Sequence, residues 1–144
     1  GKPMPDRLTY LLDTHIWIWW MTGADPLRSS PARELIANAI DAESARVSVI
    51  SVWEVGMLEA HKRIGFTGGV DSWTRQALST PGLSLAPLTP DVALASSRLP
   101  GEVHGSPADR ILIATARSLE ATLVTRDRRI LAYSQAGHVA TLAV

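Results

Sequence analysis

The sequence predicts an α/β fold in which helices cover both faces of a parallel sheet. Short runs rich in Leu, Val and Thr alternate along the chain with longer segments whose apolar residues recur at helical spacing. No internal repeat, low-complexity segment or linker divides the 144 residues. Alternation of this kind is typical of sheets whose strands are joined by helices and buried on both sides.

The chain starts with an expected strand at 8–12 and a helix at 15–21. Residues 8–12 are an apolar run closed by Asp13, and residues 15–21 leave no polar face. This pattern indicates a buried strand that turns directly into a short buried helix. Residues 23–26, Gly-Ala-Asp-Pro, should then interrupt the helix.

A helix at 30–44 is expected next, because Pro31 suits the first helical position and apolar residues follow at helical spacing. A brief β-rich strand at 46–49 and a helix at 51–63 continue the alternation. Residues 65–69 contain three glycines and indicate a loop.

The second half of the chain repeats the pattern. Its expected elements are a helix at 71–79, a strand at 83–88, a helix capped by Thr89-Pro90, a helix at 108–120, a strand at 122–125, a helix at 127–135 and a strand at 139–144. Residues 100–107 form the longest irregular stretch, and the segment after them has the strongest helical periodicity. Gly137 should end the last helix.

Composition limits the class of protein. With 46% hydrophobic residues, the chain can bury a core as one domain over 1–144, in which 1–7 are expected to be a disordered or cloning-derived start. The absence of cysteine excludes thiolate zinc sites, iron–sulfur clusters and cysteine nucleophiles. No apolar run reaches the roughly 18 residues of a membrane span, so we expect a soluble, cytoplasmic protein.

Four acids fall where a predicted strand ends or a helix begins: Asp13, Glu54, Asp109 and Asp127. Taken singly, each has a structural explanation. Asp13 and Asp127 suit helix N-caps, and Asp109 lies in a first turn, where the helix dipole favours negative charge. Glu54 could complete a capping box with Ser51, three residues earlier.

Together the four acids point to a metal site. Parallel strands end at the same edge of a sheet, so acids at those ends converge from distant parts of the chain. Clustered carboxylates repel each other unless a cation lies among them. Carboxylate oxygens suit Mg²⁺ or Mn²⁺, and the four histidines show no paired spacing that would favour zinc.

Arginines flank two of these acids. Fourteen basic and fourteen acidic residues give no net charge, so any contact with nucleic acid requires a local basic patch. The candidate phosphate-binding residues are Arg110, Arg126, Arg128 and Arg129. Ordinary surface charge would explain them equally well. The five tryptophans could stack on bases, but packing in the core or at a subunit interface is the stronger expectation.

Four blocks of sequence resemble, in the same order, the motifs of PIN-domain nucleases, above all the VapC toxins of bacterial toxin–antitoxin pairs. The blocks are LLDTH at 11–15, SVWEV at 51–55, PADRILIATA at 107–116 and LVTRD at 123–127. The resemblance extends from residue 8 to about residue 137.

This resemblance implies an α/β/α sandwich on a five-stranded parallel sheet, a pocket for Mg²⁺ or Mn²⁺, and endoribonuclease activity. Matched by position, the family's metal-binding and catalytic acids and their supporting hydroxyls are Asp13, Glu54, Asp109, Asp127, Thr14 and Thr125. Ser106 stands where many relatives carry another Asp, so a fifth ligand is not expected. The implied partners are RNA, a VapB-type antitoxin whose C-terminal segment fills the acidic groove, and a second copy of the chain.

The resulting hypothesis is hydrolysis of RNA by metal-activated water, with Asp13 and Asp109 on the principal ion. Glu54 and Asp127 would act through water or bind a second ion. A haloacid-dehalogenase-type phosphatase is disfavoured, because no second Asp follows Asp13 two residues later. A receiver-like domain needs a lysine late in the chain, and the lysines here are at 2 and 62. A catalytically inactive, magnesium-binding interaction domain is the remaining alternative.

Overall fold

The computed structural model describes residues 8–144 and contains a five-stranded parallel sheet. Its strands are β1 (Tyr10–Leu12), β2 (Ala45–Ser48), β3 (Leu83–Ala86), β4 (Thr122–Thr125) and β5 (Ala140–Ala143). They lie in the order β3-β2-β1-β4-β5, and every neighbouring pair is parallel. The predicted parallel sheet is therefore confirmed.

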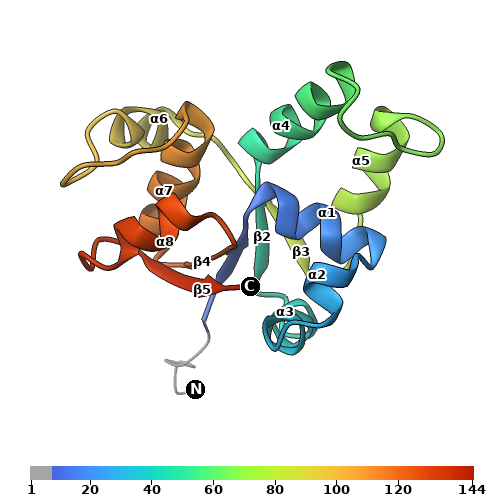
Figure 1. The fold of residues 1–144 in the computed structure, drawn as a ribbon, viewed down its shortest axis with the longest axis horizontal. Helices are drawn as coiled ribbons and strands as arrows, with labels where there is room; N and C mark the ends of the chain where they lie inside the picture. The colour runs from blue at the N-terminus through green and yellow to red at the C-terminus, as the bar shows by residue number, and fades with distance from the viewer. Residues whose placement is uncertain (1–7) are drawn as a thin grey trace.

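Eight helices connect and cover these strands in the described part of the chain. They are α1 (Thr14–Thr22), α2 (Asp25–Arg28), α3 (Ala32–Asp41), α4 (Val49–Ala60), α5 (Val70–Leu78), α6 (Pro90–Ser96), α7 (Pro107–Leu119) and α8 (Arg128–Ser134). Figure 1 shows α6, α7 and α8 on one side of the sheet, and α1, α2, α3 and α5 on the other. The architecture is thus helix, sheet, helix in three layers.

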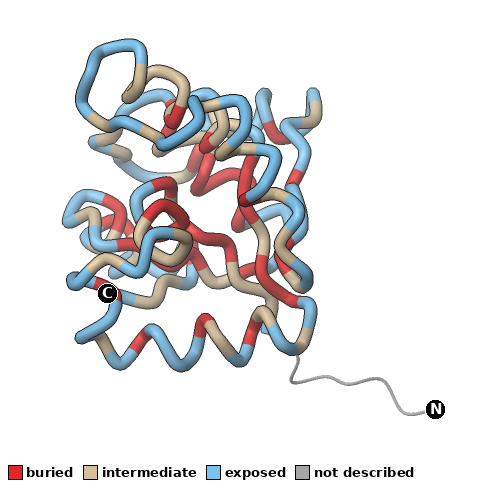
Figure 2. Tube along the Cα trace, turned by 90° about the vertical axis from the view of Figure 1, so that its right-hand side faces the viewer, coloured by how far each residue is buried: buried red, intermediate tan, exposed pale blue. Residues whose placement is uncertain are grey.

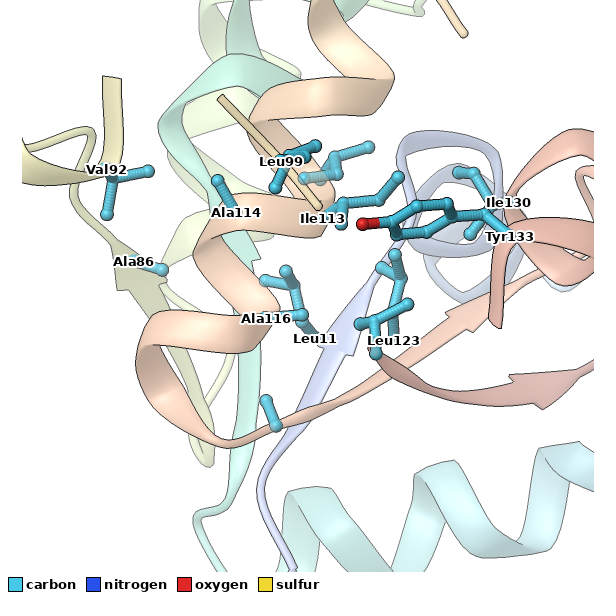
Figure 3. Close-up of a cluster of buried hydrophobic side chains, with 13 residues drawn as sticks. Leu11, Ala86, Val92, Leu99, Ile113, Ala114, Ala116, Leu123, Ile130 and Tyr133 are labelled. Carbon is cyan, nitrogen blue, oxygen red and sulfur yellow. The ribbon is translucent and has the colours of Figure 1, made fainter. Parts of the chain in front are cut away.

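Two hydrophobic cores hold the layers together, one on each face of the sheet. Successive residues of a strand point to opposite faces, so Leu11 packs with α7 and α8, whereas Leu12 packs with α1 and α3. Figure 2 shows the buried segments gathered in the middle of the molecule. In the core below α7, the Tyr133 ring lies beside Ile113 (Figure 3). Burial on both faces explains why the strands lack a polar alternation.

The tryptophans mostly pack as expected. Trp17 is fully buried, and its ring centroid lies 5.0 Å from that of Trp73. Trp53 on α4 is the exception, because 56% of its surface is exposed. Core packing therefore accounts for Trp17 and Trp73 and not for Trp53.

The predicted interruption of the first helix is confirmed, because α1 ends at Thr22 and Gly23 takes a left-handed conformation. A short helix that was not predicted, α2, follows, because Pro26 is tolerated in a first turn and Leu27 gains a buried position. The predicted start of the helix at 51–63 is wrong. Helix α4 starts at Val49 and not at residue 51, because Ser48 accepts the Ile50 N–H and caps the helix earlier.

The chain changes direction across the sheet between β1 and β4. From β1 the chain adds β2 and then β3 on one side, and it returns to place β4 and β5 on the other. Ligands of such sheets bind outside the C-terminal ends of the strands at this switch point. Asp13 follows β1 and Arg126 follows β4 at this place.

None of the helices in the described part of the chain has the length and apolar character needed to span a membrane. The expectation for residues 1–7 lies outside the described residues.

Candidate active site

A hydrogen bond between the ends of β1 and β4 lies at the centre of the site. The Thr125 hydroxyl donates to Asp13 Oδ2 over 2.6 Å, although 112 residues separate the two in sequence. Asp13 Oδ1 accepts the backbone N–H of Thr14 at 2.7 Å and caps α1. Because Thr125 is fully buried, the protein fixes both carboxylate oxygens of Asp13.

Glu54 joins the site from α4. The Thr14 hydroxyl donates to Glu54 Oε1 over 2.5 Å, and it also lies 2.8 Å from the Ser51 hydroxyl. A hydroxyl carries one proton, so Ser51 is the donor in the second contact. Thr14 and Ser51 are both buried. Two buried hydroxyls thus link the start of α1 to Glu54 and set the direction of its carboxylate.

Asp109 is held at the start of α7 by a capping box with Ser106. The Asp109 N–H donates to Ser106 Oγ and the Ser106 N–H donates to Asp109 Oδ2, each over 3.2 Å. Gly105 allows this loop to pass close to the acid, since a Cβ there would lie 3.0 Å from Asp109 Cβ. The half-buried Asp109 is therefore positioned by the loop before its helix as well as by the helix.

Asp127 caps α8 at the end of β4. Its Oδ1 accepts the backbone N–H groups of Arg129 at 2.8 Å and Ile130 at 3.1 Å. Its own N–H donates to the Thr125 hydroxyl oxygen over 3.0 Å. Asp127, Thr125 and Asp13 therefore form one chain of hydrogen bonds across the switch point.

The acids lie close enough to raise each other's pKa. Burial is the largest cause at Asp13, Glu54 and Asp109, and it raises the pKa of each carboxyl above its ordinary value. Repulsion by neighbouring acids raises these pKa values further. Asp109 raises the pKa of Asp13, Asp13 and Asp109 raise that of Glu54, and Asp127 raises that of Asp109. The hydroxyls of Thr125 and Thr14 act in the opposite direction on Asp13 and Glu54. All four acids therefore share one electrostatic environment.

The donor chemistry of this cluster fits a hard divalent cation. Neither of the two close acid–base contacts among residues 8–144, Arg28 with Asp25 and His104 with Glu102, involves these acids, so none of them is neutralised by an ion pair there. One oxygen each of Glu54, Asp109 and Asp127 also has no hydrogen-bond partner in the described part of the chain.

The spacing of the acids limits how such an ion could be held. Among the residues described, no three His, Cys, Asp or Glu side chains are close enough together to enclose an ion. Mg²⁺ does not require such a cage, because it keeps several waters and uses one or two protein carboxylates. The cluster therefore suits a hydrated Mg²⁺ or Mn²⁺ and not a dehydrated, fully protein-coordinated ion.

The four arginines predicted to bind phosphate differ in their surroundings. Arg126, Arg128 and Arg129 are exposed, and Arg129 lowers the pKa of Asp109, which places its charge beside the acids. The Arg126 guanidinium lies 5.9 Å from the centre of a Trp19 ring. Arg110 instead donates Nε to the Ser96 carbonyl over 2.9 Å and links α7 to the end of α6.

The expected capping box between Ser51 and Glu54 is wrong. Because Ser48 caps α4, Ser51 lies inside the helix and contacts Thr14, and Glu54 accepts from Thr14. The prediction also missed the role of Ser106 in fixing Asp109. The signal was present, because Ser-Pro-Ala-Asp at 106–109 has the capping-box spacing directly before the most periodic helix.

Comparison with known proteins identifies the class to which this fold and site belong. The profile of the PIN domain family matches residues 10–135. The chain belongs to the PIN-domain family. It is also 37% identical to Ribonuclease VapC22 of Mycobacterium tuberculosis (strain ATCC 25618 / H37Rv) over 123 residues. This aligned region covers 85% of this chain and 89% of that protein.

Solved structures confirm the fold. VapBC2 from Rickettsia felis, bound to a DNA fragment from its promoter, has a chain that matches with a TM-score of 0.65 at 16% identity, over 94% of this chain and 98% of that one. A chain of DNA-bound VapBC from Salmonella typhimurium matches with a TM-score of 0.62 at 14% identity, over 94% of this chain and 98% of that one. FitAcB from Neisseria gonorrhoeae gives 0.59 at 21% identity, over 93% and 96%. The five-stranded parallel sheet with helices on both sides is therefore shared with these proteins.

Replacing Glu54 with Gln should stabilise the protein at pH 8 in the presence of a chelator. The folded state raises the pKa of Glu54, so this group favours folding below about pH 4.5 and loses that contribution as the pH rises through its folded pKa. Glu54→Gln keeps the oxygen that accepts from Thr14 and removes the repelled charge. Thermal unfolding should show a higher Tm, by about 2–4 °C for each kcal/mol of burial cost and repulsion removed.

The gain from Glu54→Gln should shrink as the pH is lowered towards 4.5, where wild-type Glu54 also becomes neutral. Glu34→Gln, at an exposed position in the first turn of α3, is the matched control and should not raise the Tm at pH 8, because its charge is exposed and favoured by the helix dipole. A Glu54→Gln variant that is less stable than wild type at pH 8 would show that the acids do not repel each other in this fold.

Proposed function

We propose that this protein is a Mg²⁺- or Mn²⁺-dependent endoribonuclease and the toxin of a VapBC-type toxin–antitoxin pair. The observation that carries the proposal is the Thr125–Asp13 hydrogen bond, which joins β1 and β4 where the other acids share their electrostatic environment. Membership of the PIN-domain family and the similarity to a protein named ribonuclease support it. RNA as substrate also fits a cytoplasmic site of action.

The reaction is hydrolysis of an RNA phosphodiester by water. A divalent ion held by these acids would lower the pKa of a water and would neutralise charge on the phosphate. Asp13 and Asp109 are the proposed residues on the principal ion, with Glu54 and Asp127 acting through water or holding a second ion. The water oxygen forms a bond to phosphorus, the bond from phosphorus to the 3′ oxygen breaks, and that oxygen takes up a proton. The products are a 5′-phosphate and a 3′-hydroxyl.

Two hydroxyl groups of the site favour the ionised form of the acids. Thr125 donates to Asp13 and lowers its pKa against the effect of burial, and Thr14 does the same for Glu54. Both acids can then carry the charge that a cation requires. Neither hydroxyl is proposed as a nucleophile, because each is a donor to a carboxylate and is buried.

The exposed guanidinium groups supply phosphate contacts beside the acids. Arg126, Arg128 and Arg129 follow β4 directly and are free to reach an RNA backbone. Arg110 is the weakest of the four candidates, because its Nε is already bound to Ser96. A small basic patch next to an acidic centre allows a chain without net charge to bind a polyanion.

The proposed partners are a VapB-type antitoxin and a second copy of the chain. The structural relatives include VapBC and FitAB assemblies, which makes an antitoxin the natural partner for this fold. A basic side chain of the antitoxin can occupy the acidic centre in place of a cation, since none of these acids is in an ion pair within residues 8–144.

Replacing Asp13 or Asp109 with Asn should lower metal-dependent RNA cleavage by about 10³-fold or more, because a charged ligand is lost at the reacting phosphate. Asp91→Asn is the matched control, since Asp91 lies in the first turn of α6 on an exposed surface. Gel analysis of a labelled RNA should show 5′-phosphate ends. Cleavage to 2′,3′-cyclic phosphate ends, or full activity of either site variant, would contradict the chemistry and favour an inactive domain.

Replacing Thr125 with Val should lower kcat/KM by about 10–100-fold, the effect expected when a group that orients a metal ligand is removed. Valine keeps the volume of the buried side chain and removes the donor to Asp13. The pKa of Asp13 should rise further, so the acidic limb of the pH–rate profile should move to higher pH. Thr125→Ser should restore both activity and profile, and an unchanged profile in Thr125→Val would remove Thr125 from this role.

A short open reading frame that overlaps the start of this gene should encode the antitoxin. Co-expression of its product should yield a stable complex that no longer cleaves RNA, and Mn²⁺ should not restore cleavage while the complex is intact. Size-exclusion chromatography of the complex and a cleavage assay would measure this. If the neighbouring gene product does not bind the protein, the toxin–antitoxin role is contradicted and the nuclease activity is not.

A further inference from the structure

A hollow of about 430 Å³ lies between α8 and the loop before α7, next to the acids and outside the site described above. Small-molecule sites typically measure about 300–1,000 Å³, so the hollow is large enough for part of a nucleotide. Its walls come from two segments far apart in sequence, the loop that includes His104 and the helix that includes Arg128 and Arg129.

The charge of the hollow favours an anion. Arg128 and Arg129 line it from the first turn of α8, and two imidazoles, His104 and His138, lie on its other walls. Glu102 is the acid that lines it, and this residue already lies 3.6 Å from His104. A local excess of positive charge in a chain with no net charge indicates a phosphate-bearing ligand.

The hollow adjoins the acidic centre through two connections. Arg129, on its wall, is close enough to Asp109 to lower the pKa of that acid. Its loop wall continues from His104 into Ser106, which forms the capping box with Asp109. A ligand in the hollow therefore shares Arg129 with a phosphodiester bound at the acids.

The floor of the hollow is aromatic and held in place. The rings of Tyr133 and His138 have centroids 5.6 Å apart and are tilted by 34°. The Tyr133 hydroxyl donates to the Pro100 carbonyl over 2.7 Å, and Arg117 donates to the His138 carbonyl. Tyr133 is itself buried, so His138, which is partly exposed, offers the ring on which a nucleobase can stack.

We infer that this hollow is a nucleotide subsite, which receives the base and ribose of the RNA residue next to the cleaved phosphodiester. Arg128 and Arg129 hold that residue's phosphate, and the floor contacts its base. The inference rests on the proposed ribonuclease function and adds where the substrate lies. The antitoxin is the less suitable occupant, because the basic side chain expected of it belongs on the acids and not among arginines.

Ala132→Trp tests the subsite, because Ala132 is an exposed residue of α8 at the rim of the hollow, and a bulky ring there fills the space without changing any charge. Ala93→Trp, at an exposed alanine of α6 outside the hollow, is the matched control. Two substrates are compared with Mn²⁺: a short single-stranded RNA, and bis(p-nitrophenyl) phosphate, which contains no nucleotide and is too small to need the hollow.

Ala132→Trp should lower kcat/KM for RNA about tenfold or more, the size expected for the loss of one stacked nucleotide, and should cleave the small diester like wild type. Ala93→Trp should resemble wild type on both substrates. Wild-type cleavage of RNA by Ala132→Trp would overturn the subsite, whereas a wild-type protein that cleaves neither substrate would overturn the proposed function instead.

Two further results keep the test decisive. If Ala132→Trp loses activity on both substrates, Ala136→Trp, on the same hollow, takes its place, and normal RNA cleavage by that variant overturns the subsite. Normal RNA cleavage together with weakened antitoxin binding would assign the hollow to the protein partner and would also overturn the inference.

Discussion

The hydrogen bond from Thr125 to Asp13 is the interaction on which the candidate site depends. It joins the ends of β1 and β4, the two strands on either side of the switch point, and it holds the most deeply placed acid of the cluster. The backbone of Asp127 donates to the same hydroxyl, so a third position is fixed through one atom. Because β1 and β4 each have a strand on both sides, the bond joins two interior strands of the sheet.

The same acids both stabilise and strain the protein. Asp13 and Asp127 each accept backbone N–H groups in the first turn of a helix, and Asp109 accepts the N–H of the N-cap residue Ser106, so all three stabilise helix starts. Burial and mutual repulsion act in the opposite direction on their ionised forms. Capping and the proposed catalytic role are therefore compatible at Asp109 and Asp127, because one carboxylate oxygen of each accepts a backbone N–H while the other has no hydrogen-bond partner in the described part of the chain.

The sequence was sufficient to predict the sheet and the positions of the acids. Alternating patterns predict crossover helices, and strand ends of a parallel sheet must share an edge, so Asp13 and Asp127 could be placed together without coordinates. Details that depend on a single side-chain hydrogen bond could not be predicted in this way. Ser48 and Ser51 are both reasonable N-caps in the sequence, and only the contact of Ser51 with Thr14 separates their roles. The hollow beside α8 could not be predicted from the sequence either, because its lining residues come from segments that no local pattern connects.

The order of the strands has a consequence for how the protein is made. The site needs Asp13 from the beginning of the chain and Thr125 from near its end, and β1 obtains its second neighbour only when β4 arrives. During translation, a nascent polypeptide that stops before residue 122 therefore holds its first acid without the hydroxyl that positions it. Termination before β4 has been made therefore leaves an incomplete centre, and the whole constellation forms only in a polypeptide that includes Thr125.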